Sequence, residues 1–338
     1  MKLKVGLIGL GDQWDSRHRP ALLGLSDRFD VRAICCEVAQ KGERVAREFG
    51  AVAVDGFRAM IGRDDIEAVL ALAPDWVGHL PVLAACEAGK AIYSSAALDI
   101  APEQVAEIRS RVEKSGVVFM AELPRRFAPA TIRLKELMAT KLGRATQLFC
   151  HDRMTTESQT SHLRRGKFCP LTWRNLMEQV DWCCYLADRD PTSVISSVHR
   201  PEVNGHSTFY QAITLNFDPA GPGVPEASGQ LSVGYYMPES WREALSFRRP
   251  SSIQVLCENG VAFVDLPSSL VWFDDAGQHT ESLDSDRSVG EQMLMHFHRA
   301  VTRLVRDRAD LAVAYRAMKV VISANDSAHS GRRVTMEF

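Results

Sequence analysis

The opening segment KLKVGLIGLGDQWDSRHRP, residues 2–20, constrains the fold more than any other stretch of the chain. A short apolar run from Val5 to Leu10 ends in a Gly-x-Gly turn. Such a run, bounded by glycines, is typical of a buried parallel strand. Glycine lets the backbone approach a ligand closely, and the N–H groups of a helix that follows favour a phosphate. The segment therefore predicts the first strand and turn of a dinucleotide-binding fold.

Trp14 occupies the position of the third glycine in the usual G-x-G-x-x-G pattern. Because a tryptophan prevents close packing of helix on strand, we expect the helix to begin later, near Arg19 and Pro20, with proline in its first turn. The residues of this turn that we predict to bind a dinucleotide are Gly9, Gly11, Asp12, Gln13 and Trp14.

Strand and helix patterns alternate through residues 1–122, which predicts an α/β domain with a doubly wound parallel sheet, a Rossmann fold. The further strands are expected at 31–36, 51–54, 66–73, 91–93 and 117–120. Glu37 follows the second strand, where a carboxylate can bind the ribose hydroxyls of NAD. Its alternative role is that of a solvated glutamate at the start of the next helix.

Residues 123–338 have a different character and predict an α+β domain with an open, mainly antiparallel sheet. Helices are expected at 129–139, 173–187, 289–306 and 310–328. Strands are expected at 145–151, 193–199, 208–217, 227–236, 253–257, 261–264 and 333–337, and residues 152–172 are expected to form a loop.

Composition excludes several classes of partner. The 338 residues carry 40 basic and 42 acidic side chains, a net charge of −2. This balance predicts no bulk attraction to nucleic acid or to an acidic membrane surface. No apolar run reaches the roughly 20 residues of a membrane helix, and the 8 cysteines form no C-x-x-C pair. We expect a cytoplasmic protein without a metal site.

Four segments together resemble the Gfo/Idh/MocA family of NAD(P)-dependent oxidoreductases: GLIGLG at 6–11, RVAREFGA at 44–51, ALAPDWVGHLPVLAACEAGKAIY at 71–93 and RRFAP at 125–129. The resemblance implies oxidation or reduction of a sugar, cyclitol or related polyol. It also implies that Pro74 and His79 lie near the cofactor. In this family the free face of the second-domain sheet often forms the subunit interface, so we expect a homo-oligomer, a dimer or a tetramer.

Two departures from the family pattern bear on catalysis. Ala96 stands where the family has the catalytic lysine of its Glu-Lys-Pro segment. If Asp181 is the aspartate that the family carries on a second-domain helix, Glu178 occupies the position of the family's histidine. The resemblance therefore implies an atypical proton-transfer group.

Glu178 and Asp181 are the first candidates to replace it. With Trp182 and Tyr185 they share one helix face, and two carboxylates on one face can share a proton. In the alternative interpretation Arg174 pairs with Glu178 one turn away, and Asp181 has a structural role.

Glu122 and His151 are the other catalytic candidates. Glu122 ends the sixth strand, at the edge of a parallel sheet that faces the ligand. We expect one of two roles for Glu122 there: contact with the nicotinamide carboxamide or the substrate, or an ion pair with Arg125 or Arg126. His151 ends the first strand of the second domain, and a histidine titrates in the range that proton transfer requires, although a lone histidine at a strand end more often has a structural role.

Three functions stay open at this point. The leading hypothesis is an NAD(P)-dependent oxidoreductase, with NAD favoured because Glu37 would repel a 2′-phosphate, unless Cys36 takes that position instead. The second is a nucleotide- or sugar-binding protein that has lost catalysis. The third is an enzyme that uses bound NAD transiently without net redox change.

Overall fold

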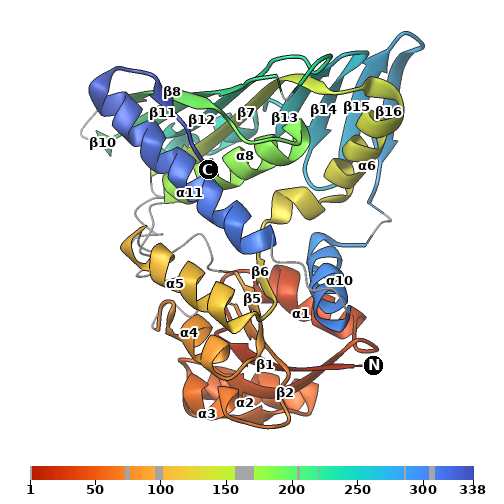
Figure 1. Cartoon of the computed structure of the whole chain (residues 1–338), viewed down its shortest axis with the longest axis vertical. Coiled ribbons are helices and arrows are strands. Elements are labelled where there is room, and N and C mark those ends of the chain that lie inside the picture. Colours follow the sequence, from red (N-terminus) through yellow and green to blue (C-terminus); the bar gives the residue numbers. More distant parts are fainter. Residues whose placement is uncertain are drawn as a thin grey trace. The chain divides into compact units, whose positions relative to one another are not determined.

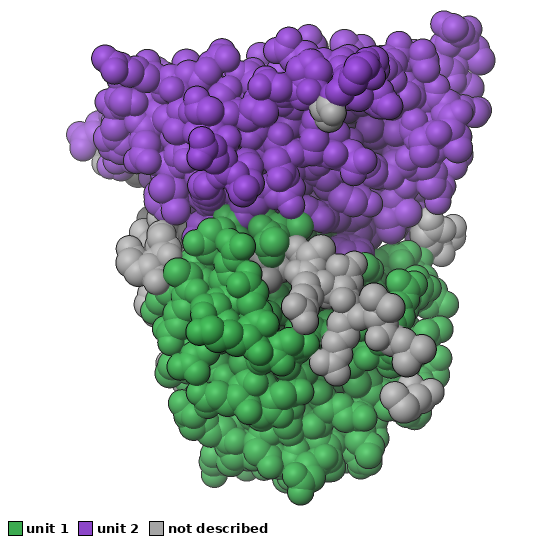
Figure 2. Space-filling model, in the orientation of Figure 1, with its two compact units in different colours: residues 1–124, 166–169, 287–315 green, residues 125–165, 170–286, 316–338 purple. Residues whose placement is uncertain are grey.

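The computed structural model describes residues 2–72, 77–95, 102–156, 171–203, 206–219, 221–284, 287–303 and 309–338. These residues form two compact units, which Figure 2 shows in different colours. Unit 1 lies within residues 1–124 and 287–315, and unit 2 within residues 125–165, 170–286 and 316–338.

Unit 1 is built on a six-stranded sheet in the order β3-β2-β1-β4-β5-β6. All of its neighbouring strands pair in parallel, which confirms the predicted doubly wound sheet. The strands are β1 (Leu3–Ile8), β2 (Phe29–Cys35), β3 (Val52–Ala53), β4 (Ala68–Ala71), β5 (Ala91–Ser94) and β6 (Phe119–Ala121). All four residues of β4 are buried, as expected of a strand that has helices on both faces of its sheet.

The helices of unit 1 include one from late in the chain. The helices are η1 (Trp14–His18, a π-helical turn), α1 (Arg19–Gly24), α2 (Ala39–Phe49), α3 (Phe57–Ile61), α4 (Leu80–Glu87), α5 (Pro102–Ser115) and α10 (Val289–Thr302). A capping box between Ser288 and Glu291 starts α10. The ring of Phe297 in this helix lies 5.7 Å from the ring of Tyr93, so α10 completes the core beside β5.

Unit 2 is built on a nine-stranded sheet in the order β16-β15-β14-β13-β7-β12-β11-β8-β17. One pair, β7 with β12, is parallel and the others are antiparallel, so the prediction of a mainly antiparallel sheet is confirmed. The strands are β7 (Ala145–Thr155), β8 (Ser193–His199), β11 (Phe209–Phe217), β12 (Ala227–Met237), β13 (Ile253–Cys257), β14 (Gly260–Asp265), β15 (Ser269–Asp274), β16 (Gly277–Ser282) and β17 (Val334–Thr335). A separate two-stranded ladder joins β9 (Glu202–Val203) to β10 (His206–Ser207).

The hairpin of β15 and β16 was not among the predicted strands. Its first strand, SLVWFD, does alternate between exposed and buried residues, and Gly277 follows the turn with a φ of +108°. The second strand, GQHTES, is polar and largely exposed. Because it lies at the edge of the sheet, it lacks the apolar residues on which the strand prediction depended.

Helices cover one face of this sheet, as Figure 1 shows for α6 (Pro129–Leu137), α8 (Leu171–Ala187) and α11 (Ala309–Ser330). The smaller helical turns are η2 (Pro124–Phe127), η3 (Met138–Leu142), η4 (Glu239–Trp241) and α9 (Glu243–Ser246). On the covered face, the Sγ atom of Cys183 in α8 lies 3.8 Å from that of Cys150 in β7. None of the helices among the described residues is long and apolar enough to cross a membrane.

The opposite face of the sheet carries apolar side chains that are partly exposed. Ile195, Tyr236, Leu256 and Phe273 are each 38–40% exposed. Their strands alternate, so that residues of the other parity pack on the helices. Unit 2 by itself therefore has one covered and one open face.

Candidate functional site

The carboxyl edge of the unit 1 sheet is the place where this fold can bind a ligand. The strand order reverses between β1 and β4, and ligands of such sheets bind in the crevice outside the carboxyl ends of the strands at that point. Gly9 follows β1 directly with a φ of +75°, a left-handed conformation that favours glycine. Glu37 is exposed two residues beyond the end of β2. The predicted turn and acidic residue are therefore at the same edge.

Trp14 does not obstruct this edge. Its side chain is 2% exposed, and its ring centre lies 6.0 Å from that of Phe49 at the end of α2. The predicted start near Arg19 is confirmed for the α-helical part only: α1 begins at Arg19 with proline in its first turn, but a π-helical turn, Trp14–His18, precedes it without a break. A glycine in the left-handed region and a tryptophan that is buried against α2 fit a dinucleotide at this position.

Glu122, one of the predicted catalytic residues, closes a buried ion cluster at the same edge. It follows β6, and its carboxylate contacts Arg17 through Nη1 and His18 through Nε2, the latter at 2.9 Å. Burial alone would raise the pKa of this carboxyl group, but the hydrogen bonds and charges of His18 and Arg17 lower it to about 2. Glu122 is therefore an anion at neutral pH.

The partners of Glu122 differ from the two arginines that were considered from the sequence. Arg17 and His18 belong to the turn that follows β1, more than a hundred residues earlier in the chain. Sequence reasoning missed both residues as functional candidates. The available signal was their position directly after the Gly-x-Gly turn, in the segment where Trp14 breaks the usual pattern.

Tyr93 supports the cluster from β5. Its side chain is fully buried, and its hydroxyl lies 3.7 Å from the Sδ atom of Met293 in α10. Burial, together with the nearby charge of Glu122, raises the pKa of this phenol well above its usual value. A neutral, buried phenol here packs the core and does not reach a ligand.

In unit 2, two consecutive arginines hold the candidate carboxylates of α8. Asp181 accepts two bonds from Arg126, with Nε at 2.6 Å. The Oε2 atom of Glu178 lies 3.5 Å from Nε of Arg125, and its Oε1 atom lies 3.4 Å from Nε of Arg174. The pairing of Glu178 with Arg174 follows the structural alternative considered from the sequence.

The same two arginines contact the aromatic residues of this helix face. Arg125 lies over the ring of Trp182 at 5.5 Å, and Arg126 over the ring of Tyr185 at 5.0 Å. The predicted common face of α8 is therefore confirmed. Arg125 also donates to Asp152 of β7 at 2.7 Å, so this cluster fills the space between α8 and the sheet.

His151 lies on the other face of the sheet. Its neighbours Cys150 and Asp152 contact α8 and Arg125, and successive side chains of a strand point to opposite faces. Its Nδ1 is 2.8 Å from the hydroxyl of Ser232, and burial and the charge of Arg153 lower its pKa. Since the sheet separates His151 from Glu178, the two residues of unit 2 do not meet around one ligand.

The remaining predicted residues are placed as follows. Asp12 and Gln13 are exposed in the turn before η1, and Gly11 is half-buried. His79 is half-buried at the residue before α4. Pro74 and Ala96 lie outside the described residues.

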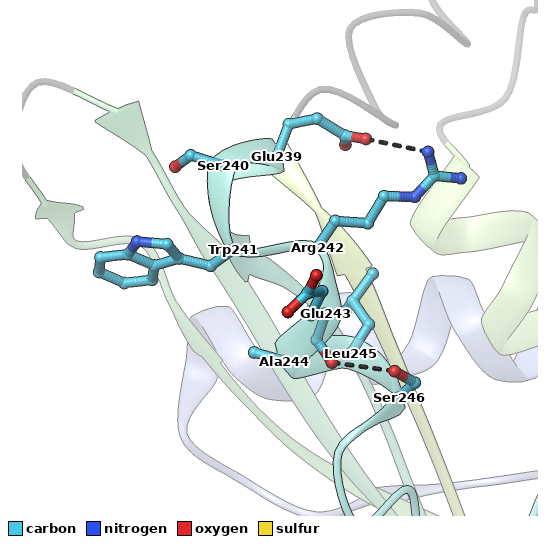
Figure 3. Close-up of a pocket in the computed structure, with 8 residues that line it drawn as sticks. All are labelled: Glu239, Ser240, Trp241, Arg242, Glu243, Ala244, Leu245 and Ser246. Carbon is cyan, nitrogen blue, oxygen red and sulfur yellow. Dashed lines mark hydrogen bonds and ion pairs between the residues drawn. The ribbon is translucent and has the colours of Figure 1, made fainter.

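Unit 2 also contains pockets that do not coincide with α8. Figure 3 shows one that is lined by eight consecutive residues from Glu239 to Ser246. Its polar contacts are local, from Arg242 to Glu239 and from the Ser246 hydroxyl to the Glu243 carbonyl oxygen. A second pocket, of about 420 Å³, includes His151 in its wall together with Arg249 and two phenylalanines.

The chain was compared with protein families and with curated proteins. Residues 3–123 match the model of the Gfo/Idh/MocA oxidoreductase family, described as having an NAD-binding Rossmann fold. No curated protein matches the sequence closely enough to count as a relative.

Solved structures match nearly the whole chain. An aldose-aldose oxidoreductase from Caulobacter crescentus has a TM-score of 0.81 at 14% identity, covering 99% of this chain and 100% of its own. A candidate myo-inositol dehydrogenase from Sinorhizobium meliloti has a TM-score of 0.75 at 16% identity, with the same coverage.

An NAD-binding oxidoreductase from Klebsiella pneumoniae has a TM-score of 0.77 at 16% identity, covering 99% of both chains. At these identities the structural likeness shows the fold. The predicted resemblance is confirmed to this extent: residues 3–123 match the model of the NAD-binding Rossmann fold of the Gfo/Idh/MocA oxidoreductases, and the chain shares the fold of the solved oxidoreductases.

Proposed function

We propose that the protein is a cytoplasmic NAD(P)-dependent oxidoreductase that acts on a sugar, cyclitol or related polyol, with NAD as the favoured cofactor. The carrying observation is the Gly9 turn at the strand-order reversal of unit 1, in a segment that matches an NAD-binding family. Exposed Glu37 beside this edge supports NAD, because a carboxylate binds two ribose hydroxyls and repels a 2′-phosphate.

The bound cofactor would supply the hydride chemistry, and the chain must bind both ligands and move one proton. Among the predicted candidates, Glu178 is best suited to the proton. Its two arginine partners lie at 3.4 and 3.5 Å, whereas Asp181 makes a close two-point contact with Arg126. A carboxylate with looser partners can exchange them for a substrate hydroxyl at lower cost.

The second candidate function is a nucleotide- or sugar-binding protein without catalysis. The observation that favours it is that Glu122, Glu178 and Asp181 each contact at least one arginine. A carboxylate held as an anion by arginine is a weak general base near neutral pH. The two functions predict the same cofactor binding and differ in turnover.

The deciding experiment is a fluorescence titration of the purified protein with NADH and NADPH, followed by a panel of polyols and sugars monitored by nicotinamide absorbance. Saturable quenching of tryptophan fluorescence together with a substrate-dependent change in absorbance would establish the oxidoreductase. Binding without turnover would favour the binding protein. If the protein binds neither nucleotide, the proposal is wrong.

One substitution tests the position of the cofactor. Gly11→Val should abolish nucleotide binding, because a branched side chain fills the space where the backbone approaches the pyrophosphate. Gly62→Val is the matched control: Gly62 is exposed, follows α3 with a φ of −70°, and lies before β4 at the other edge of the sheet. Unchanged affinity of Gly11→Val for NADH would remove this turn from the site.

We also propose that the protein is a homo-oligomer, a dimer or a tetramer, assembled through the open face of the unit 2 sheet. The partly exposed Leu256 and Phe273 on this face support the proposal. Sedimentation of the wild type and of a Leu256→Lys/Phe273→Lys variant tests it: the wild type should be oligomeric and the variant smaller. Equal sedimentation of both would contradict it.

A further inference from the structure

We propose that Arg17 binds the pyrophosphate of the dinucleotide, and that Glu122 is the positioning residue that holds its guanidinium. The inference rests on the proposed function and adds a side chain to a turn in which the backbone alone is expected to contact the phosphates. It is carried by the position of the Arg17–Glu122 pair, by the exposure of its members, and by the shape of the turn.

The pair lies along the edge where the ligand is expected. Arg17 belongs to the turn that follows β1, and Glu122 follows β6. The strands β4 and β5 lie between β1 and β6 in the sheet. The ion pair therefore spans the carboxyl ends of β4 and β5, from the turn after β1 to the residue after β6. A dinucleotide that binds in the crevice at the switch point would lie against this pair.

Arg17 is the most exposed of the three residues of the cluster. The side chain of Arg17 is 22% exposed, whereas those of Glu122 and His18 are 1% and 2% exposed. A ligand in solution can therefore reach Arg17 but neither of its partners. A guanidinium has five N–H donors in a planar fork, so one edge can stay on Glu122 while another binds a phosphate.

The turn explains how Arg17 comes to this position. A π-helical turn adds a residue to the usual helical repeat and changes the direction of the side chains that follow. The backbone of Arg17 is also fixed by α10, since a Cβ atom on Gly290 would lie only 2.8 Å from the Arg17 carbonyl oxygen. The segment that departs from the glycine pattern at Trp14 thus presents a cation that the pattern itself lacks.

A purely structural role explains this arrangement less well. An ion pair buried for stability alone is often matched or exceeded by apolar residues of similar volume. Here both partners lie at the ligand edge, and the cation is the partly exposed member. Preorganisation of a phosphate-binding arginine accounts for the cluster and for its location.

The test compares ligands with and without the pyrophosphate. Binding of NADH, ADP-ribose and adenosine is measured by calorimetry, with saturation-transfer NMR for the weakest ligand, on the wild type, on Arg17→Ala and on Arg17→Ala/Glu122→Gln. The double variant removes Arg17 and also replaces the Glu122 carboxylate, which would otherwise lose a partner in a buried place. We therefore expect the double variant to fold. Arg63→Ala is the matched control, because Arg63 pairs with Asp65 before β4, at the opposite edge of the sheet.

We expect both Arg17 variants to bind NADH and ADP-ribose about 10- to 100-fold more weakly, with adenosine binding unchanged. Arg63→Ala should bind all three ligands as the wild type does. The inference is overturned if the folded double variant binds ADP-ribose as tightly as the wild type, or if it loses adenosine to the same extent. Failure of the wild type to bind NADH, NADPH or ADP-ribose would instead overturn the proposed function.

Discussion

Glu122 in unit 1 and Glu178 in unit 2 were both candidate catalytic carboxylates, and both contact arginine, yet their surroundings differ. Glu122 is 1% exposed and takes His18 at 2.9 Å in addition to its arginine. Glu178 is 14% exposed, and its arginines lie at 3.4 and 3.5 Å. The hydrogen bonds and charges of His18 and Arg17 keep the first carboxylate ionised near neutral pH, whereas the second is more exposed and has longer contacts. This contrast is the basis on which we propose a positioning role for Glu122 and proton transfer for Glu178.

The largest expected effect comes from Glu178→Gln, which keeps the shape of the side chain and removes its ability to exchange a proton. We expect turnover to fall by about 100-fold or more, with the free energy of unfolding changed by less than about 1 kcal/mol because the ion pairs are long and partly exposed. Steady-state kinetics and urea unfolding measure the two quantities.

Asp181→Asn is the contrasting variant on the same helix. Breaking its buried two-point contact with Arg126 should cost stability, about 3 kcal/mol. Full activity of Glu178→Gln would contradict the proposal that Glu178 transfers the proton.

Glu122→Leu should have the next largest effect, on stability. Leucine leaves His18 and Arg17 without their shared acceptor in a buried place, which should lower the free energy of unfolding by about 3–5 kcal/mol. Glu113→Leu serves as the control, because Glu113 pairs with Arg109 on the exposed side of α5 and should change stability by less than about 1 kcal/mol. If Glu122→Leu lowered the free energy of unfolding as little as Glu113→Leu does, the cluster would not be a stabilising element.

The smallest expected effect is the pH dependence of the same cluster. The pKa of Glu122 is about 2 in the folded protein against 4.5 for an unperturbed glutamate, so the unfolded state takes up the proton first. The stabilisation is complete above about pH 5 and is lost as the pH falls towards 2. Between pH 6 and pH 3 we expect a loss of about 2 kcal/mol from this group. Urea unfolding of the wild type and of Glu122→Gln at both pH values checks it, and parallel losses in the two proteins would argue against the lowered pKa.

The sequence predicted local features well and long-range partners poorly. The late start of α1 followed from Trp14 and Pro20, since both act on the backbone next to them. The common face of α8 followed from helical spacing. The partners of Glu122 could not be predicted from its neighbours in the sequence. The nearest arginines, Arg125 and Arg126, form ion pairs with Asp152 and Asp181 in unit 2 instead.

By itself, the sequence determined the order of strands and helices in unit 1, the change from a parallel to a mainly antiparallel sheet, and the family whose model residues 3–123 match. These are properties of periodicity and of short motifs, which neighbouring residues encode. Only the tertiary structure decided that Glu122 meets Arg17 and His18, and that His151 and Glu178 lie on opposite faces of one sheet. Such pairings depend on which surfaces the chain buries together, and no local pattern records them.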